Sequence, residues 1–251
     1  MAFPNTIYGK YGWEKVQTSE QKHKLGTRMS FDDGRVFRYC EVGGSDIAAG
    51  AIVQAPAGVA NHDMDLDIAT AASGVTSLTV TLGGTAATAN QYKDGYLYIN
   101  DGTGAGEGSL YKIKSNAAGD SGGTCVITLD EEDGTVTAVT NGTTKVGLSV
   151  NPYSNVIISP TTVSNIAVGV APRALTTNYY GWLQTWGPAS VLCNAAGVIG
   201  EPVRVGGAST AGGFEDLDRD GSGENEAVIG HQMLIASVAT DYALIDLNIA
   251  P

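Results

Sequence analysis

The chain has 251 residues, of which 43% are hydrophobic and 16% are charged, and it contains 34 glycines. This length and this share of apolar residues exclude a disordered chain and are typical of one large β domain or two smaller ones. The 14 Lys and Arg residues against 26 Asp and Glu residues give a net charge of −12, and no segment gathers enough basic residues to neutralise a run of phosphates, so direct nucleic-acid binding is not expected.

Neither a signal peptide nor a membrane span is predicted. The first residues lack a basic segment followed by an apolar core, and no apolar run reaches the length needed to cross a membrane. Cys40, Cys125 and Cys193 lie far apart, outside any metal-binding motif, and are predicted to be small buried hydrophobes. We therefore expect a protein that is made and used in soluble form, without a membrane partner.

Residues 1–25 are predicted to form an extended N-terminal arm. Their large apolar residues follow neither a helical nor a strand period: Phe3, Ile7, Tyr8, Tyr11 and Trp13. Aromatic side chains on such an arm need a surface to cover them, which the rest of the chain or a neighbouring subunit can supply. These five residues are predicted to form an interface.

Residues 26–60 begin a β-barrel domain. Large apolar and polar residues alternate over residues 35–42, directly after the Asp-Asp-Gly turn at residues 32–34, which predicts a strand leaving a hairpin. Residues 47–53 are predicted to form a short strand pair around Gly50.

Residues 61–159 carry the clearest β pattern. Strands are predicted at residues 75–82, 95–100, 110–114 and 124–129. The Asp-Gly and Asn-Gly dipeptides between and after them are typical of tight turns. No helical stretches separate these strands, so the pattern predicts an antiparallel β-sandwich or barrel lobe inserted into the first domain.

Residues 160–251 return to short, Gly-rich strands. They are predicted at residues 168–172, 180–186, 189–193 and 202–205, followed by an apolar closing pair at 228–236 and 242–249. The predicted fold class is therefore all-β. Residues 26–60 and 160–251 would form a small Gly-rich β-barrel, residues 61–159 the inserted lobe, and residues 1–25 the arm.

The densest aromatic cluster lies at residues 179–186. Alternation along a strand would place Tyr180, Trp182 and Trp186 on one face. The cluster could pack in the core, form a subunit interface or present a platform for sugars. We counted the three residues as interface candidates.

The acidic segment at residues 216–226 has the spacing of the first half of a calcium loop. Asp216, Asp218 and Asp220 occupy positions 1, 3 and 5, and Gly221 occupies position 6. Ala227 stands where a bidentate Glu is required, and no amphipathic helices flank the loop, so an EF-hand is excluded. The segment either binds calcium in an irregular loop or is a solvated acidic loop, and no other cofactor is expected.

The two ends of the chain resemble decoration proteins and related head proteins of tailed bacteriophages. The resemblance is carried by the segments at residues 25–28, 35–42, 46–53, 169–172, 179–191, 229–230 and 242–248. It implies a capsid decoration or cement protein without catalytic residues, made in the host cytoplasm and bound to the outer capsid surface of the virion. Its implied partners are the major capsid protein and further copies of itself, as a homotrimer.

Two alternatives stay open. A carbohydrate-binding head fibre or host-adhesion module would use the aromatic cluster as its sugar surface, and an enzyme built on paired carboxylates comes after it. If the protein is a capsid decoration protein, deleting residues 1–15 is expected to leave the β domain folded and to weaken attachment to the shell.

Overall fold

The computed structural model describes residues 6–101, 106–130, 132, 134–195, 197–206, 210–217, 227–236 and 238–251. These residues form 17 strands and one 3-10 helix, η1 (Trp13–Lys15), and they include no α-helix. The predicted all-β fold is confirmed. Over the same ranges, the structure contains no helix with the length and hydropathy of a membrane span.

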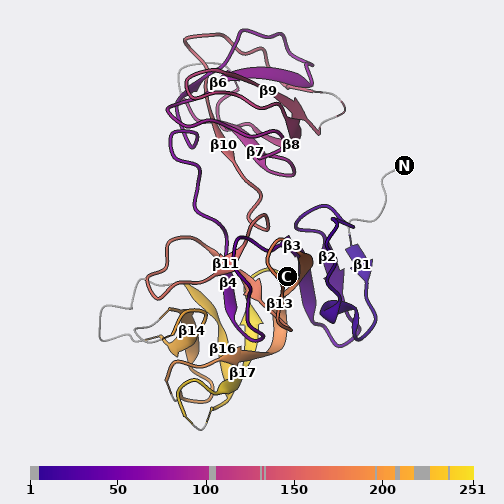
Figure 1. Cartoon of the computed structure of the whole chain (residues 1–251), viewed down its shortest axis with the longest axis vertical. Helices are drawn as coiled ribbons and strands as arrows, with labels where there is room; N and C mark the ends of the chain where they lie inside the picture. The colour runs from indigo at the N-terminus through magenta and orange to yellow at the C-terminus, as the bar shows by residue number, and fades with distance from the viewer. Residues whose placement is uncertain are drawn as a thin grey trace. The chain divides into compact units, whose positions relative to one another are not determined.

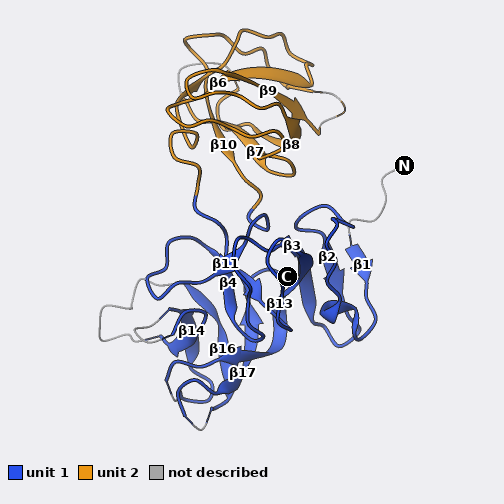
Figure 2. Ribbon diagram, in the orientation of Figure 1, with its two compact units in different colours: residues 1–57, 152–251 blue, residues 58–151 orange. Residues whose placement is uncertain are grey.

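The chain divides into two compact units (Figure 2). Residues 1–57 and 152–251 form the large unit, and residues 58–151 form the inserted unit. The predicted insertion, residues 61–159, covers most of the second unit, and the predicted arm lies in the first. All three cysteines are buried and unpaired.

The large unit is built on one branched sheet of 11 strands (Figure 1). Its main path runs β1-β2-β3-β13-β17-β16-β14-β15, while β12 joins β13 to β4, and β4 pairs with β11. The pairing of β1 with β2 is parallel, and the other strand pairs are antiparallel. The strands are β1 (Thr6–Tyr8), β2 (Arg28–Ser30), β3 (Val36–Glu41), β4 (Ile52–Gln54), β11 (Ile157–Ile158), β12 (Ala167–Val170), β13 (Tyr180–Leu192), β14 (Pro202–Val205), β15 (Phe214–Asp216), β16 (Val228–Leu234) and β17 (Tyr242–Asn248).

Strand β13 is the centre of this sheet. Its first half pairs with β3, and its second half, from Trp186 onward, pairs with β17. The strand changes neighbours at a bulge between Gln184 and Trp186. The buried Gln184 side chain supports this bend, because its Nε2 lies 3.2, 3.2 and 2.8 Å from the carbonyl oxygens of Trp186, Gly187 and Pro188.

Three apolar cores lie along this sheet. The first lies where β2 and β3 pair next to the arm, and it includes Met29, Phe37, Tyr39 and Trp182. The second surrounds the turns near β4 and β12, and the third fills the space enclosed by β14 to β17. Strand β13 contributes side chains to all three cores. It therefore joins β2 and β3 to the C-terminal strands β14 to β17.

The inserted unit is a six-stranded antiparallel sheet in the order β5-β10-β7-β8-β9-β6. An isolated bridge between Ile68 and Val80 links the two ends of this order, so the sheet is nearly closed into a barrel. Side chains alternate between inside and outside: Leu97 and Ile99 are buried in β7, and Ile113 is buried in β8. The strands are β5 (Leu66–Asp67), β6 (Ser77–Thr81), β7 (Tyr96–Ile99), β8 (Leu110–Asn116), β9 (Thr124–Leu129) and β10 (Lys145–Ser149).

A hydrogen-bonded pair is enclosed within the inserted unit. His62 and Tyr92 are both fully buried, with 2.5 Å between His62 Nδ1 and the Tyr92 hydroxyl and 2.7 Å between His62 Nε2 and the Thr85 carbonyl oxygen. Because a carbonyl oxygen can only accept, Nε2 carries the proton and Nδ1 accepts from Tyr92. Burial raises the pKa of the Tyr92 phenol, so that it remains a donor.

The Tyr92→Phe variant should destabilise the inserted unit by about 1–3 kcal/mol, because it leaves His62 Nδ1 buried without a donor. Chemical denaturation followed by far-ultraviolet circular dichroism measures this change. Tyr98→Phe is the matched control, since the Tyr98 hydroxyl donates to the Asp63 carbonyl in an exposed position. Equal effects of the two substitutions would contradict the assigned role of the buried pair.

Candidate binding surface

The arm is paired with the large unit from Thr6 onward. Strand β1 lies beside β2, and Gly9 N donates to Ser30 O over 3.0 Å. Further along, Thr18 and Tyr180 exchange two backbone hydrogen bonds of 2.9 and 2.8 Å. Between these anchors the chain turns at Gly12, whose φ of 98° favours glycine, and forms η1. The arm is therefore held against β2, β3 and β13.

Under the arm lies a cluster of aromatic rings. Tyr39 and Trp182 pack edge to face with ring centroids 5.0 Å apart, and His23 lies 5.1 Å from the first and 5.6 Å from the second. Tyr180 stacks on Tyr39 and donates to Glu41 over 2.9 Å. Burial, followed by this hydrogen bond, raises the pKa of Tyr180 to about 12, and burial lowers the pKa of His23. Trp182 is only 6% exposed, so it belongs to the core.

Above this cluster the arm presents large apolar side chains to solvent. Tyr8 is 81% exposed, Tyr11 61%, Val16 53% and Trp13 46%. An apolar groove of about 240 Å³ runs among them, lined by Ile7, Trp13, Val16, His23 and Trp182. We call the surface formed by Ile7, Tyr8, Tyr11, Trp13, Val16, His23 and Trp182 the arm face.

Tyr11 is held in place although its ring is exposed. Its hydroxyl donates to Asp32 Oδ1 over 2.5 Å, and its ring meets Phe31 edge to face at 5.4 Å. The Arg35 guanidinium lies 5.8 Å from the Tyr11 ring centroid, within cation–π range. The hydrogen bond to Asp32 raises the pKa of the Tyr11 phenol. An exposed ring fixed in this way loses little conformational entropy when a partner covers it.

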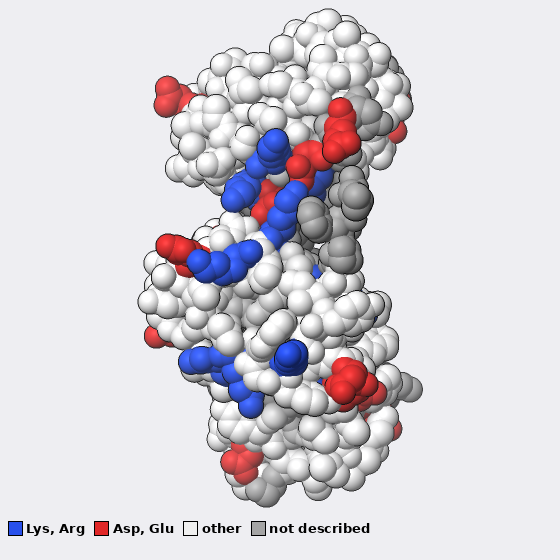
Figure 3. All heavy atoms as spheres, turned by 90° about the vertical axis from the view of Figure 1, so that its right-hand side faces the viewer, with Lys and Arg blue, Asp and Glu red and all other residues white. Residues whose placement is uncertain are grey.

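Four residues of the arm face, Tyr11, Trp13, Val16 and His23, belong to a sequence segment that is basic although the chain as a whole is acidic. Residues 10–38 hold seven of the 14 Lys and Arg residues but only four of the 26 Asp and Glu residues, so their net charge is +3 and the rest of the chain carries −15. Figure 3 shows Lys and Arg side chains on one face of the molecule, with Asp and Glu side chains beside several of them. The combination of exposed aromatic rings and positive charge suits a partner that is acidic and partly apolar.

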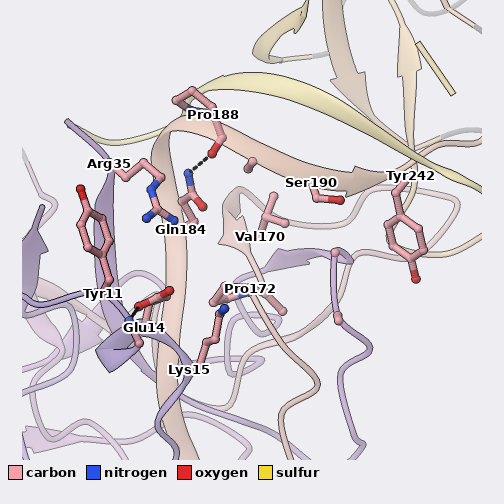
Figure 4. A pocket seen from close by; sticks show the side chains of 15 residues that line it. Tyr11, Glu14, Lys15, Arg35, Val170, Pro172, Gln184, Pro188, Ser190 and Tyr242 are labelled. Carbon is pink, nitrogen blue, oxygen red and sulfur yellow. Dashed lines mark hydrogen bonds between the residues drawn. The ribbon is translucent and has the colours of Figure 1, made fainter. Parts of the chain in front are cut away.

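A larger cavity of about 690 Å³ adjoins Tyr11 in the same unit (Figure 4). Tyr11, Glu14, Lys15 and Arg35 line one end, and Ser190 and Tyr242 line the other. Backbone and side chains of β12 and β13 form much of its wall: Val170, Gln184, Pro188, Ala189 and Ser190. Two tyrosines beside charged and hydroxyl groups could contact a sugar or a polar peptide segment.

Among the interface candidates, Ile7 and Trp13 line one groove with Trp182, and Ile7 and Tyr180 pack on the core that contains Trp182, although more than 160 residues separate the two groups in the sequence. Tyr8 and Tyr11 lie on the same arm but have no contact with Trp182 or Tyr180 among the described interactions. Trp186 does not share their face. Because of the bulge it pairs with Val36, whereas Gln184 pairs with Phe37, and neighbouring residues of a strand point to opposite faces. Phe3 lies outside the described residues.

The predicted metal loop is described only at its start. Asp216 ends β15, and Asp218 and Asp220 lie outside the described residues. Within the described ranges, no group of three His, Cys, Asp or Glu side chains is placed to hold a metal ion.

Sequence reasoning missed two residues of the arm face and one residue that contacts it. Val16 and His23 line the groove, and Arg35 contacts the Tyr11 ring. The segregation of positive charge into residues 10–38 was visible in the sequence and marks the same region. The contacts themselves depend on the pairing of β1 with β2, which no local sequence pattern predicts.

Comparison with known proteins adds no relative to this picture: no family model, no curated protein and no solved structure matches the chain.

Proposed function

We propose that this protein is a structural component of a tailed-phage virion, a decoration or cement protein that binds the outer surface of the capsid. In this proposal the arm face is the attachment surface, the major capsid protein is the partner, and copies of the protein associate as trimers around a local three-fold axis. The proposal needs no catalytic group. It rests on the resemblance at the two ends of the chain and on one structural observation, the exposed aromatic rings of the arm face.

The physical argument starts from the arm face. Tyr8, Tyr11 and Trp13 are large, exposed and anchored to a sheet, and aromatic side chains of this kind dominate the binding energy of protein interfaces. The positive charge of residues 10–38 would attract an acidic shell surface and raise the association rate. Many copies on one shell would add their individually modest contacts.

The test is a double substitution, Tyr8→Ser with Trp13→Ser, assayed on expanded shells of the source virus that lack this protein. Each aromatic anchor is expected to contribute at least about tenfold to affinity, so the double variant should bind about a hundredfold more weakly. Its melting temperature should stay close to that of the wild type, because Tyr8 is 81% and Trp13 46% exposed and neither belongs to an apolar core of the described residues.

Leu110→Ser is the control. Leu110 lies in the inserted unit and is 60% exposed, so this substitution removes a comparable exposed apolar side chain away from the arm face. Shell binding by the double variant at wild-type affinity would exclude the arm face as the attachment surface. Absence of saturable binding by the wild-type protein would argue against a decoration role.

A carbohydrate-binding module is the second candidate, and the cavity beside Tyr11 favours it. Tyr11 and Tyr242 flank polar groups that could bond to sugar hydroxyls. A glycan array probed with the wild-type protein and with Tyr242→Ser separates the two functions. Glycan binding that depends on Tyr242, without affinity for shells, would support this candidate over the first.

A further inference from the structure

Two buried side-chain oxygens converge beside Gly197, at the end of the large unit formed by β14, β15 and β16. Asp216 Oδ1 and Gln232 Oε1 are both buried, and the described part of the chain supplies neither with a hydrogen-bond donor. A Cβ atom on Gly197 would lie 2.5 Å from the first oxygen and 1.9 Å from the second. The two oxygens therefore lie no farther apart than the sum of these distances.

Both side chains are oriented by their other polar atoms. Val198 N donates to Asp216 Oδ2 over 3.1 Å, which leaves Oδ1 directed toward Gln232. Gln232 is only 2% exposed, and its Nε2 donates to Leu234 O over 3.4 Å, which leaves Oε1 directed toward Asp216. The backbone fixes the same region, because Gly200 N donates to Gln232 O and Gln232 N donates to Glu201 O.

Two acceptors that face each other in a buried position are unfavourable unless something positive lies between them. Oxygen ligands from a carboxylate and an amide carbonyl are the set that calcium prefers, and calcium tolerates irregular geometry.

We propose that Asp216 and Gln232 bind a divalent cation of the calcium class, with water completing its coordination. The cation ties the end of β15 to β16 and to the turn at residues 197–200. This site differs from the linear loop expected from the sequence, since Gln232 comes from a strand beyond that loop. It is also separate from the arm face and does not depend on the proposed function.

The proposal accounts for Gly197. Its φ does not lie in the left-handed region, so the backbone itself does not require glycine there. The restriction comes from the two oxygens, because any side chain at this position would displace them. Gly197→Ala is therefore expected to weaken cation binding.

The first experiment titrates the full chain, stripped with a chelator, with calcium chloride and records melting curves and binding heats. Calcium should raise the melting temperature in a saturable manner, because a ligand bound only by the folded state stabilises it. Asp216→Asn and Gln232→Leu should each weaken calcium binding at least about tenfold. Asp246→Asn, which changes an exposed carboxylate on β17, should bind calcium as the wild type does.

Gln232→Glu distinguishes a cation from a direct contact between the two side chains. If calcium lies between them, the added carboxylate should bind calcium more tightly, and calcium should restore the stability that the variant loses in chelator. If the Gln232 amide instead donates to Asp216 directly, the variant places two carboxylates together and is destabilised to the same extent with and without calcium.

The proposal is overturned if calcium has no effect on the wild-type melting curve, or if Gln232→Glu is destabilised equally in calcium and in chelator. It is also overturned if calcium binding survives both Asp216→Asn and Gln232→Leu. Loss of binding on Asp218→Ala alone, with Asp216→Asn unaffected, would likewise place the ion elsewhere.

Discussion

Replacing Trp182 with alanine is expected to destabilise the large unit by about 3–5 kcal/mol, the usual cost of removing a buried tryptophan. Trp182 is 6% exposed and packs edge to face against Tyr39, and the His23 ring centroid lies 5.6 Å from that of Trp182. Its removal would leave a cavity beneath the arm that neighbouring rings cannot fill without losing their own contacts.

Tryptophan fluorescence measures this loss selectively, since all three tryptophans of the chain, Trp13, Trp182 and Trp186, lie in the large unit. Trp13 and Trp186 remain as reporters in the variant. Trp186→Ala is the matched control: Trp186 is only partly buried and belongs to none of the apolar cores of the described residues, so its loss should cost clearly less. Equal costs for the two substitutions would contradict the assignment of Trp182 to the core.

Most of the strand positions could be predicted because they depend on local patterns. Alternation over residues 124–129 and 202–205 predicts β9 and β14 at the bounds found in the structure. Strand β13 was harder: Gly187 and Pro188 predict a break, so residues 180–193 were divided into two strands. The chain instead continues through a bulge supported by Gln184. That support comes from a side chain's bonds to nearby carbonyls, which composition does not reveal.

The candidate surface could be predicted only in part, for the same reason. The arm aromatics and the β13 aromatics each stood out by density, but their meeting depends on the parallel pairing of Thr6 with Arg28 and on the bridge from Thr18 to Tyr180. Parallel strands are not joined by a hairpin turn, so no turn motif in the sequence predicts this pairing of segments about 20 residues apart. Trp186 was grouped with Trp182 by strict alternation, which the bulge interrupts.

The structure changes the expected effect of deleting residues 1–15 on stability. The sequence suggested an arm whose loss leaves the β domain intact. In the structure, however, Ile7 packs on the core that contains Met29 and Phe31, and a Cβ atom on Gly9 would lie within 2.3 Å of Phe31 and 2.7 Å of Met29. We therefore expect the truncated protein to lose about 2–4 kcal/mol, because roughly 100–150 Å² of apolar surface would be exposed at about 25 cal/mol per Å².

The truncated chain should still fold, since the pairing of β3 with β13 and the two other cores of the large unit are formed by residues outside 1–15. Its tryptophan-detected unfolding should shift to lower denaturant, whereas unfolding of the inserted unit, which has no tryptophan, should stay unchanged in circular dichroism. An unshifted tryptophan transition would mean that the arm contributes nothing to the fold and is free to act as a separate tether. We expect the truncated protein to show this shift of the unfolding midpoint and the Tyr8→Ser, Trp13→Ser variant to show none. That pair of results would separate two roles of one segment: Ile7 and Gly9 cover the core of the large unit, and Tyr8 and Trp13 contact a partner.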